Sequence, residues 1–387
     1  MRSSVRTRAA IIGAGIAGAT CARFLTDAGH AVQLFEKSRG TGGLMATRRG
    51  QWAGDDGVVH AAAFDHGAPG FTARSPDFAR FVEQAQRDGL LSRWAPVVAP
   101  GSYTPLDGLA LWVPVPDMPS MCRALLAGVP VNLGCTVDSL RRVPGGWRIE
   151  SAGTVVAEGF SDVVVAIPPQ QTAPLLQPHS PRWAQRARTL TMLPGWTLMG
   201  VTADAQARPA WDLAWPTQGP LSWIVRNDAK PGREHVPGLA HWVVHATAPW
   251  SQTHLESPAA ELQAVLQEAL AKWLGRSLTW RHAAVQRWRY ASVPRASASA
   301  SASASAEATA RCWRDASLGL GVCGDALGGA GVEGAWASGR ALATGSATAI
   351  AHPRPTLACP HRDHVEPASP QSWPFLTLGL PKETRLS

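Results

Sequence analysis

The sequence has no long apolar run, no closely spaced pair of cysteines and little lysine. A helix that spans a bilayer needs about 20 consecutive apolar residues, so we expect no membrane association. The cysteines form neither a C-x-x-C pair nor the spacing of a metal site, and we expect no bound metal; they are Cys21, Cys122, Cys135, Cys312, Cys323 and Cys359. Buried free thiols are typical of a reducing compartment, so we expect a cytoplasmic protein.

The chain also lacks a continuous block of basic residues, although its formal net charge is +8. Its arginines are scattered, which is typical of a solvated surface with a few anion-binding positions. Proteins that bind nucleic acids concentrate their basic residues in a patch or stripe. We therefore expect a small-molecule substrate and no nucleic-acid partner, while the sequence leaves the oligomeric state open.

Residues 9–49 contain the pattern of a nucleotide-binding βαβ unit. A short apolar strand meets a G-x-G-x-x-G motif that opens a helix, and a second strand ends in an acidic residue. Such glycines permit a tight turn, the approach of a pyrophosphate and close helix packing, and the acid binds the hydroxyls of an unphosphorylated ribose. The expected nucleotide contacts are Gly13, Gly15, Ile16, Ala17, Gly18 and Glu36.

The next segment, KSRGTGGLMATRR at residues 37–49, resembles the second glycine motif of the FAD-binding amine-oxidase superfamily and is most similar to its renalase-like branch. The resemblance implies that this loop packs against the phosphates of FAD. Leu44 stands where an arginine is usual, so Arg39, Arg48 or Arg49 would have to supply the missing contact. The cofactor contacts implied here are Lys37, Arg39, Gly42, Gly43, Leu44 and Arg48.

The segment FDHGAPGFTAR at residues 64–74 resembles a signature that lies near the flavin ring in the same family. Pro69 and Gly70 replace the usual glutamine and aromatic residue of that signature. An imidazole ordinarily titrates near neutrality, so His66 is a candidate acid–base group, with a structural histidine as the alternative. The cofactor contacts implied by the signature are Asp65, His66, Gly67 and Ala68.

Residues 318–343 indicate a strand, a Gly-Asp pair and a helix. In flavoproteins similar to this family, the aspartate of the pair bonds the ribityl chain, and the helix N-terminus faces the pyrimidine end of the flavin. A positive helix terminus stabilises the negative charge of a reduced flavin. The resemblance implies contacts at Gly324, Asp325, Gly331, Val332 and Glu333.

We expect the middle of the chain to form the part of the site that binds the substrate. Residues 162–171 form an apolar run that is typical of a strand buried on both faces. Residues 181–290 are rich in tryptophan and predict an antiparallel sheet that could enclose a flat substrate over the flavin. Within them, the segment WRYA resembles a family strand close to the flavin, so Arg289 and Tyr290 are candidate substrate contacts, with structural roles as the alternative.

The resemblance covers most of residues 8–346 and implies an α/β fold of the p-hydroxybenzoate-hydroxylase kind. In such a fold a Rossmann-type FAD-binding domain is interrupted by a mixed α+β substrate domain. We assign residues 1–90, 150–180 and 312–350 to the first domain, and residues 91–149 and 181–295 to the second. The Ala/Ser-rich residues 296–311 are expected to be a flexible insertion, and the proline-rich residues 351–387 a disordered tail.

We therefore predict an FAD-dependent oxidoreductase in which a small planar donor transfers hydride to the flavin, and oxygen or another acceptor reoxidises it. The renalase-like resemblance favours a dihydronicotinamide as donor. An amine oxidase and a catalytically silent FAD-binding protein are the alternatives. No cysteine motif for covalent flavin is present, so FAD should be noncovalent, and no lysine lies in the flavin-N5 motif of amine oxidases; the lysines are Lys37, Lys230, Lys272 and Lys382.

Overall fold

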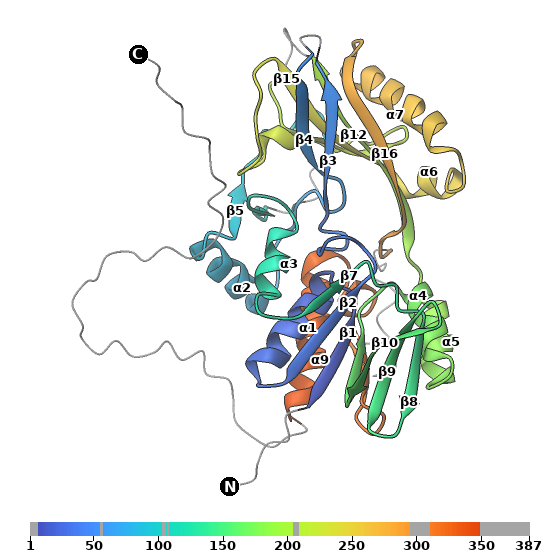
Figure 1. Cartoon of the computed structure of the whole chain (residues 1–387). Coiled ribbons are helices and arrows are strands. Elements are labelled where there is room, and N and C mark those ends of the chain that lie inside the picture. The colour runs from blue at the N-terminus through green and yellow to red at the C-terminus, as the bar shows by residue number, and fades with distance from the viewer. Residues whose placement is uncertain are drawn as a thin grey trace, which may run out of the picture. The chain divides into compact units, whose positions relative to one another are not determined.

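The lower half of Figure 1 contains a six-stranded sheet with a buried central strand. Its order is β17 (Trp313–Asp315), β18 (Leu320–Val322), β11 (Asp162–Val165), β1 (Arg8–Ile12), β2 (Ala31–Glu36) and β7 (Val131–Leu133). β1 pairs parallel with both β2 and β11. Residues 9–12 are buried on both faces of the sheet, which explains why this strand is uniformly apolar rather than alternating.

The computed structural model describes residues 7–54, 57–102, 106, 108–203, 209–294 and 310–348. The described residues belong to one compact unit, Met1–Ile350, and the expected tail, residues 351–387, lies outside the described residues. The expected Ala/Ser insertion also lies outside them, apart from its last two residues. None of the described helices combines the length and the apolar character needed to cross a membrane.

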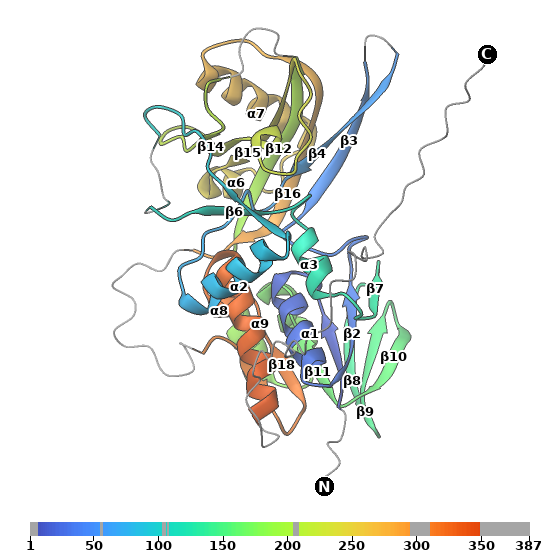
Figure 2. The ribbon, with the colours of Figure 1, turned by 90° about the vertical axis from the view of Figure 1, so that its left-hand side faces the viewer.

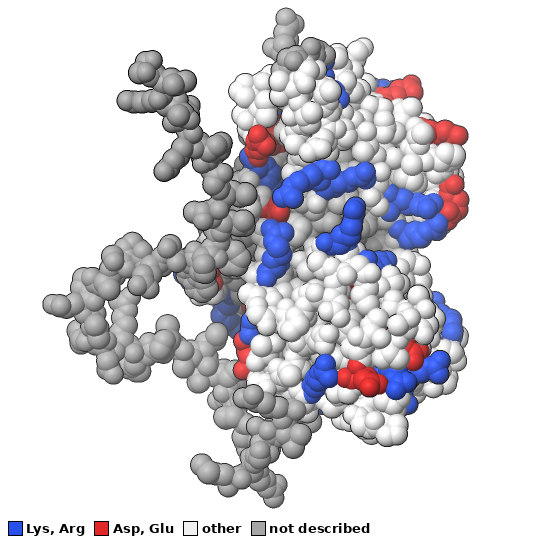
Figure 3. Space-filling model, in the orientation of Figure 1, with Lys and Arg blue, Asp and Glu red and all other residues white. Residues whose placement is uncertain are grey.

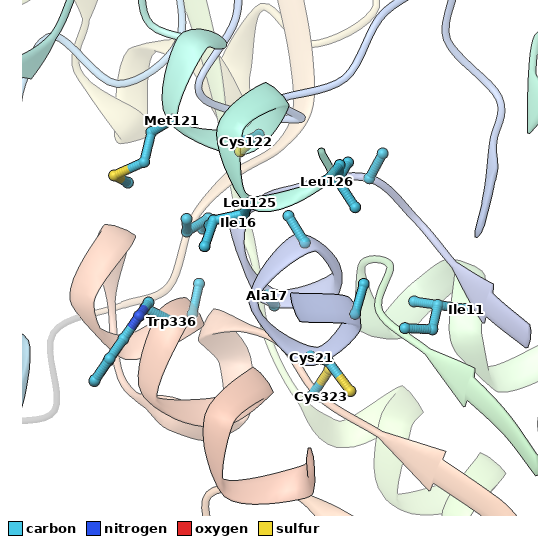
Figure 4. Packing of buried hydrophobic residues seen from close by; sticks show 14 of the residues in the cluster. Ile11, Ile16, Ala17, Cys21, Met121, Cys122, Leu125, Leu126, Cys323 and Trp336 are labelled. Atoms are coloured by element: carbon cyan, nitrogen blue, oxygen red, sulfur yellow. The ribbon is translucent and has the colours of Figure 1, made fainter. Parts of the chain in front are cut away.

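Two helices, α1 (Ile16–Asp27) and α9 (Gly331–Thr348), pack against each other on one face of the six-stranded sheet, and α3 (Ser120–Leu125) packs on α1. The two longer helices approach closely because of Gly339, where a Cβ atom would lie 2.1 Å from the carbonyl oxygen of Ala17. Figure 4 shows this core, with Trp336 of α9 near α1 and with Cys21 beside Cys323.

The opposite face of the sheet is covered by a three-stranded sheet, β8 (Ser139–Val143), β9 (Gly146–Ser151) and β10 (Thr154–Phe160), and by α4 (Pro169–Leu176) and α5 (Pro181–Thr189). Trp147 is buried in this layer, and its indole N–H donates to the carbonyl oxygen of Leu318 at 3.0 Å. Phe160 meets Phe35 of β2 edge to face, with ring centroids 6.1 Å apart.

This packing corrects the predicted domain division for residues 131–149 and 181–189, which we had assigned to the substrate domain. β7 extends the six-stranded sheet by pairing parallel with β2. The three-stranded sheet and α5 bury their apolar side chains on the same sheet. Alternating apolar residues show that a strand has a buried face, but they do not show which sheet that face packs against.

The upper half of Figure 1 is an antiparallel five-stranded sheet, as the tryptophan-rich stretch predicted. Its order is β13 (Leu213–Ala214), β14 (Leu221–Arg226), β15 (Leu239–Ala246), β12 (Leu193–Ala203) and β16 (Thr279–Ser292). Two helices, α6 (Ala248–Thr253) and α7 (Ala259–Leu274), pack on the sheet, with Leu262 and Leu266 of α7 in the core of one face. A hairpin of β3 (Thr47–Ala53) and β4 (Val59–Asp65) packs on the other face.

Several shorter elements complete the two halves. They are α2 (Pro76–Arg87), β5 (Leu91–Trp94), β6 (Leu111–Pro114), η1 (Asn227–Ala229) and α8 (Asp325–Gly328). Figure 2 shows α2, α8 and β6 near the level where the halves meet. α2 packs on α9 through Phe78 and Trp336, whose ring centroids lie 5.2 Å apart. The predicted α/β fold, with a Rossmann-type unit and a second, antiparallel sheet, is confirmed.

Candidate functional site

A cavity of about 3230 Å³ lies between the six-stranded and the five-stranded sheet. Ligand pockets usually measure about 300–1,000 Å³, so this cavity has room for a dinucleotide and for a second small molecule. Gly18 and Asp65 do not line it. The other predicted site residues do: Gly13, Gly15, Ile16, Ala17, Glu36, Lys37, Arg39, Gly42, Gly43, Leu44, Arg48, His66, Gly67, Ala68, Arg289, Tyr290, Gly324, Asp325, Gly331, Val332 and Glu333.

The two glycine loops meet at one end of the cavity. The amide of Gly42 donates to the carbonyl oxygen of Ala14 at 2.9 Å, and Gly42 forms a β-bridge with Gly15. A Cβ atom on Gly15 would have only the Cα of Gly43 within 4 Å, at 3.9 Å, so the loop surface stays open to a ligand. No side chain caps the N-terminus of α1, which leaves its first N–H groups available to an anion.

Gly18 has a packing role behind the loop rather than a contact with a ligand. A Cβ atom at this position would lie 2.0 Å from the carbonyl oxygen of Gly13. Gly13 itself has a φ of 107°, and a Cβ there would lie 2.5 Å from the carbonyl oxygen of Ala166. Both positions therefore require glycine so that α1, β1 and the chain after β11 can approach each other.

Glu36 lies at the end of β2 with its carboxylate held beside the first glycine loop. One oxygen accepts a hydrogen bond from the amide of Ala14 and the other from the amide of Ser38, both at 2.8 Å. The residue is 7% exposed and lines the cavity. This position fits the predicted role of an acid that binds ribose hydroxyls.

Asp65 does not reach the cavity, so the predicted cofactor contact of this residue is wrong. Its carboxylate accepts hydrogen bonds from Lys230 at 3.0 Å, from Arg233 at 2.8 Å and from Thr47 at 2.7 Å. Burial raises the pKa of Asp65, but the two cations and the hydrogen bonds outweigh that effect, and the pKa is lowered overall. Asp65 thus anchors the end of β4 through an ion pair with partners that are 165 and 168 residues away in the sequence.

His66 follows directly and turns toward the cavity. The indole N–H of Trp288 donates to its carbonyl oxygen at 3.1 Å, and the two rings lie 5.0 Å apart. Burial, with a smaller effect of Arg48, lowers the pKa of His66 to about 4, and its Nδ1 is buried without a hydrogen-bond partner. The ring is therefore neutral at physiological pH and suits a neutral hydrogen-bonding role better than that of a protonated acid.

A second histidine with a lowered pKa, His245 on β15, lines the cavity and was not among the predicted site residues. Its Nε2 is shielded from solvent and has no hydrogen-bond partner, while its Nδ1 lies 3.3 Å from the hydroxyl of Thr197. Burial lowers the pKa of His245 to about 3, and Lys230 adds to the effect. The register of β15 with Trp223 of β14 places both side chains on one sheet face, but that register is not visible in the sequence.

The two candidate substrate contacts, Arg289 and Tyr290, lie on opposite faces of strand β16. Alternate residues point to opposite faces of a strand, and Tyr290 shares its face with Trp288, whereas Arg289 lies on the other face. The Arg289 guanidinium forms two hydrogen bonds with Glu256, at 2.5 and 2.9 Å. Arg289 lines the cavity while its exposed side chain is paired with Glu256, and its role as a substrate contact stays a prediction.

The C-terminal motif lies at the same cavity, although not every side chain of it faces a ligand. Glu333 accepts hydrogen bonds from the amides of Ser75 at 2.7 Å and Arg74 at 2.9 Å, so its carboxylate holds the start of α2 instead. Asp325 lines the cavity, and burial raises its pKa. The first residues of α9, Gly331 and Val332, line the cavity with the positive end of the helix.

Two family models match this chain. The model described as NAD(P)-binding Rossmann-like domain matches residues 11–85, which contain both glycine loops. The model described as flavin containing amine oxidoreductase matches residues 101–345, more than half of the chain. The chain belongs to the flavin-containing amine oxidoreductase family. It is therefore a flavin-dependent oxidoreductase.

Two curated relatives of this amine oxidoreductase are tRNA 5-methylaminomethyl-2-thiouridine biosynthesis bifunctional proteins MnmC. The protein from Magnetococcus marinus is 31% identical over 215 residues, which is 46% of this chain and 32% of the relative. The protein from Thiobacillus denitrificans is 26% identical over 336 residues, which is 72% of this chain and 49% of the relative. The chain thus spans at most about half the length of these relatives.

Solved structures share the fold of this amine oxidoreductase at low sequence identity. A protein from Exiguobacterium sp. 255-15 assigned as a protoporphyrinogen oxidase is 13% identical, with a TM-score of 0.66 over 90% of this chain and 100% of that one. An oxidoreductase from Methanosarcina mazei is 15% identical, with a TM-score of 0.57 over 88% and 100%. Wild-type putrescine oxidase bound to putrescine is 14% identical, with a TM-score of 0.55 over 90% and 99%.

Proposed function

We propose that this family member binds FAD noncovalently and oxidises a small planar donor of the dihydronicotinamide kind, as the renalase-like resemblance suggests. The observation that carries the proposal is the position of Glu36 beside two joined glycine loops, at one end of a cavity whose other wall is aromatic. Two phosphate loops and a ribose-binding acid are the features of a dinucleotide site. A mononucleotide would leave the acid without a ligand.

Noncovalent binding is supported by the state of the cysteines at the cavity. Cys135 and Cys323 line it, and burial raises the pKa of the Cys135 thiol, while the Cys21 thiol and burial raise that of Cys323. A thiol with a raised pKa is a poor nucleophile. Neither group is therefore suited to form a bond with the flavin.

When bound, the flavin would supply the redox chemistry by accepting a hydride and passing electrons to oxygen or another acceptor. The chain itself would orient the donor and exclude water. Trp223, Trp288 and Tyr290 offer flat surfaces for a planar ring, and the uncharged His66 and His245 offer hydrogen-bonding groups beside it. This arrangement requires no charged acid or base on the substrate side.

The test uses the visible spectrum of the purified protein. We expect a flavin spectrum, release of FAD into the supernatant after acid precipitation, and anaerobic bleaching by a dihydronicotinamide but not by simple amines. Bleaching by amines alone would favour an amine oxidase instead, the second candidate that the family membership supports. A yellow protein that no donor bleaches would favour a silent FAD-binding protein.

A further inference from the structure

The described strands of the five-stranded sheet, which form the substrate wall of the cavity, bring no acidic side chain to it. None of the described strands of the five-stranded sheet, β12 to β16, contains aspartate or glutamate. In the β3–β4 hairpin, the described strands contain one acid, Asp65, which is buried and paired with Lys230 and Arg233. A positively charged donor would therefore find no unpaired counter-ion on these strands; Glu234, the acid of the upper half that lines the cavity, lies on the loop between η1 and β15.

The acidic residues that do line the cavity lie elsewhere. They are Glu36 after the glycine loop, Asp117 paired with Arg123, Asp138 before β8, Glu234 on the exposed loop after η1, and Asp325 and Glu333 at α8 and α9. Of these six, Glu36, Asp325 and Glu333 lie on the nucleotide side, and Asp117 is held in a salt bridge with Arg123. Glu333, in addition, is bonded to the backbone at the start of α2.

Arg48 on β3 is positioned to give this wall a positive charge. Arg48 is paired with Phe64 across the hairpin, and the Phe64 ring stacks on that of His282 of β16 with centroids 5.9 Å apart, so Arg48 shares the face turned toward β16. Its charge also lowers the pKa of His66 and His282. Gly50, which shares its strand face, would bring a Cβ within 2.4 Å of the His282 ring, which shows that this face is turned toward β16. Arg48 is exposed and lines the cavity.

Three arginines that line the cavity, Arg39, Arg48 and Arg49, form no ion pair with a described carboxylate, and Arg48 is the one on the hairpin face turned toward β16. Arg123, Arg233 and Arg289 each form an ion pair with a carboxylate. No carboxylate in the described part of the chain pairs with Arg48. On the face shown in Figure 3, basic side chains gather across the middle, between the two sheets, with few acidic ones among them. An unpaired guanidinium at the mouth of an aromatic cavity is a binding group for a carboxylate or phosphate.

We infer that the donor is an anion, and that Arg48 binds its carboxylate or phosphate while the planar ring lies against the wall that contains Trp288. This inference rests on the proposed function, because it names the substrate class of the same site. It predicts that ammonium compounds bind worse than anions of the same shape. Arg48 is thus a specificity residue of the substrate half, in place of the cofactor contact that the family resemblance implied for it, whereas the glycine loops serve the dinucleotide half.

The test measures binding of non-reducing ligands to the flavin-loaded protein through the flavin spectrum and tryptophan fluorescence. Benzoate, benzamide and benzylamine form an anionic, neutral and cationic series of one shape. Nicotinamide mononucleotide and nicotinamide riboside differ by one phosphate, so the two sets separate carboxylate from phosphate recognition. We expect benzoate or the mononucleotide to bind about tenfold or more tightly than its uncharged or phosphate-free counterpart.

The variant Arg48→Gln should abolish that difference and leave benzamide binding unchanged, while Arg48→Lys, which keeps the charge, should retain part of it. Arg93→Gln, an exposed arginine of β5 that does not line the cavity, is the matched control and should have no effect. The inference would be overturned by equal affinities across each series, by a preference for benzylamine, or by a lack of binding at millimolar concentration. It would also be overturned if Arg48→Gln kept the affinity difference of the unmodified protein.

These outcomes are separate from those that test the proposed function. Anion binding through Arg48 in a protein that no donor bleaches would reject the donor oxidation and retain the anion site. Bleaching by dihydronicotinamides that is unchanged in Arg48→Gln would retain the donor oxidation and reject the anion site. Retained flavin and an unchanged melting temperature in both Arg48 variants verify that the fold is intact.

Discussion

The ammonium nitrogen of Lys230 lies 3.0 Å from the carboxylate of Asp65, and both side chains are fully buried. Arg233 contacts the same carboxylate at 2.8 Å. The ion pair joins the end of β4, next to His66, to the turn that follows η1 in the upper half. The geometry at His66 therefore depends on Asp65 and Lys230, neither of which lines the cavity.

Replacement of Asp65 by asparagine should destabilise the protein strongly, because two buried cations would lose their counter-ion. Removing one partner of a buried pair costs about 3–5 kcal/mol. Chemical denaturation monitored by tryptophan fluorescence would measure the loss. The control is Asp27→Asn, which breaks an exposed pair with Arg23 at the end of α1 and should cost less than about 1 kcal/mol. Similar losses in the two variants would contradict this interpretation.

His66 should make stability depend on pH in the acidic range. Its pKa in the folded protein is about 4, below the ordinary value of 6.5, so the unfolded chain binds a proton that the folded protein excludes. Stability should therefore fall as the pH drops below 6.5, by about 2 kcal/mol at pH 5 from this one group. Unfolding curves between pH 7 and 5 would measure the slope, which His66→Asn should reduce. An equal slope in the variant would argue against a neutral buried ring.

The crossing of α1 and α9 should not tolerate a methyl group at Gly339. A Cβ atom there would lie 2.1 Å from the carbonyl oxygen of Ala17, so Gly339→Ala must push the helices apart. Overpacking of this kind costs about 1–3 kcal/mol. In the same helix a Cβ on Gly345 would meet nothing within 4 Å, and Gly345→Ala should be neutral or stabilising by up to about 1 kcal/mol. The melting temperature of Gly339→Ala should fall, whereas that of Gly345→Ala should stay the same or rise.

Glu36→Gln should weaken FAD binding about tenfold, since an amide replaces a carboxylate that we propose to bind the ribose hydroxyls. Titration of the apoprotein with FAD would measure the dissociation constant. Affinity for FMN, which lacks that ribose, should be unchanged. Glu158→Gln alters an exposed residue of β10 paired with Arg148 and is the matched control. Equal losses for FAD and FMN would point to a folding defect rather than a lost contact.

Features that depend on a few neighbouring residues could be predicted from the sequence. Gly13 has a backbone conformation that favours glycine, Gly15 leaves the loop surface open and Gly18 permits close packing. Glu36 follows at the distance that one helix and one strand require. The Gly324–Asp325 motif likewise carries its own strand and helix. All of these positions, apart from Gly18, meet at the cavity.

Features that depend on partners far along the chain could not be predicted. Asp65 and Glu333 both occur in segments that resemble cofactor motifs, yet one pairs with Lys230 and the other with the start of α2. The face of β16 that carries Arg289 follows from strand register, which a single sequence does not determine. The same limit explains why residues 131–149 were assigned to the wrong half.

The two walls of the cavity come from different sheets, so their chemistry can change independently. The loops after β1 and β2 depend on backbone positions that need glycine, whereas the wall opposite them is built from side chains of strands. A substitution on that wall, for example at Gln286 of β16, can therefore change the charge presented to a donor without altering the backbone of the glycine loops.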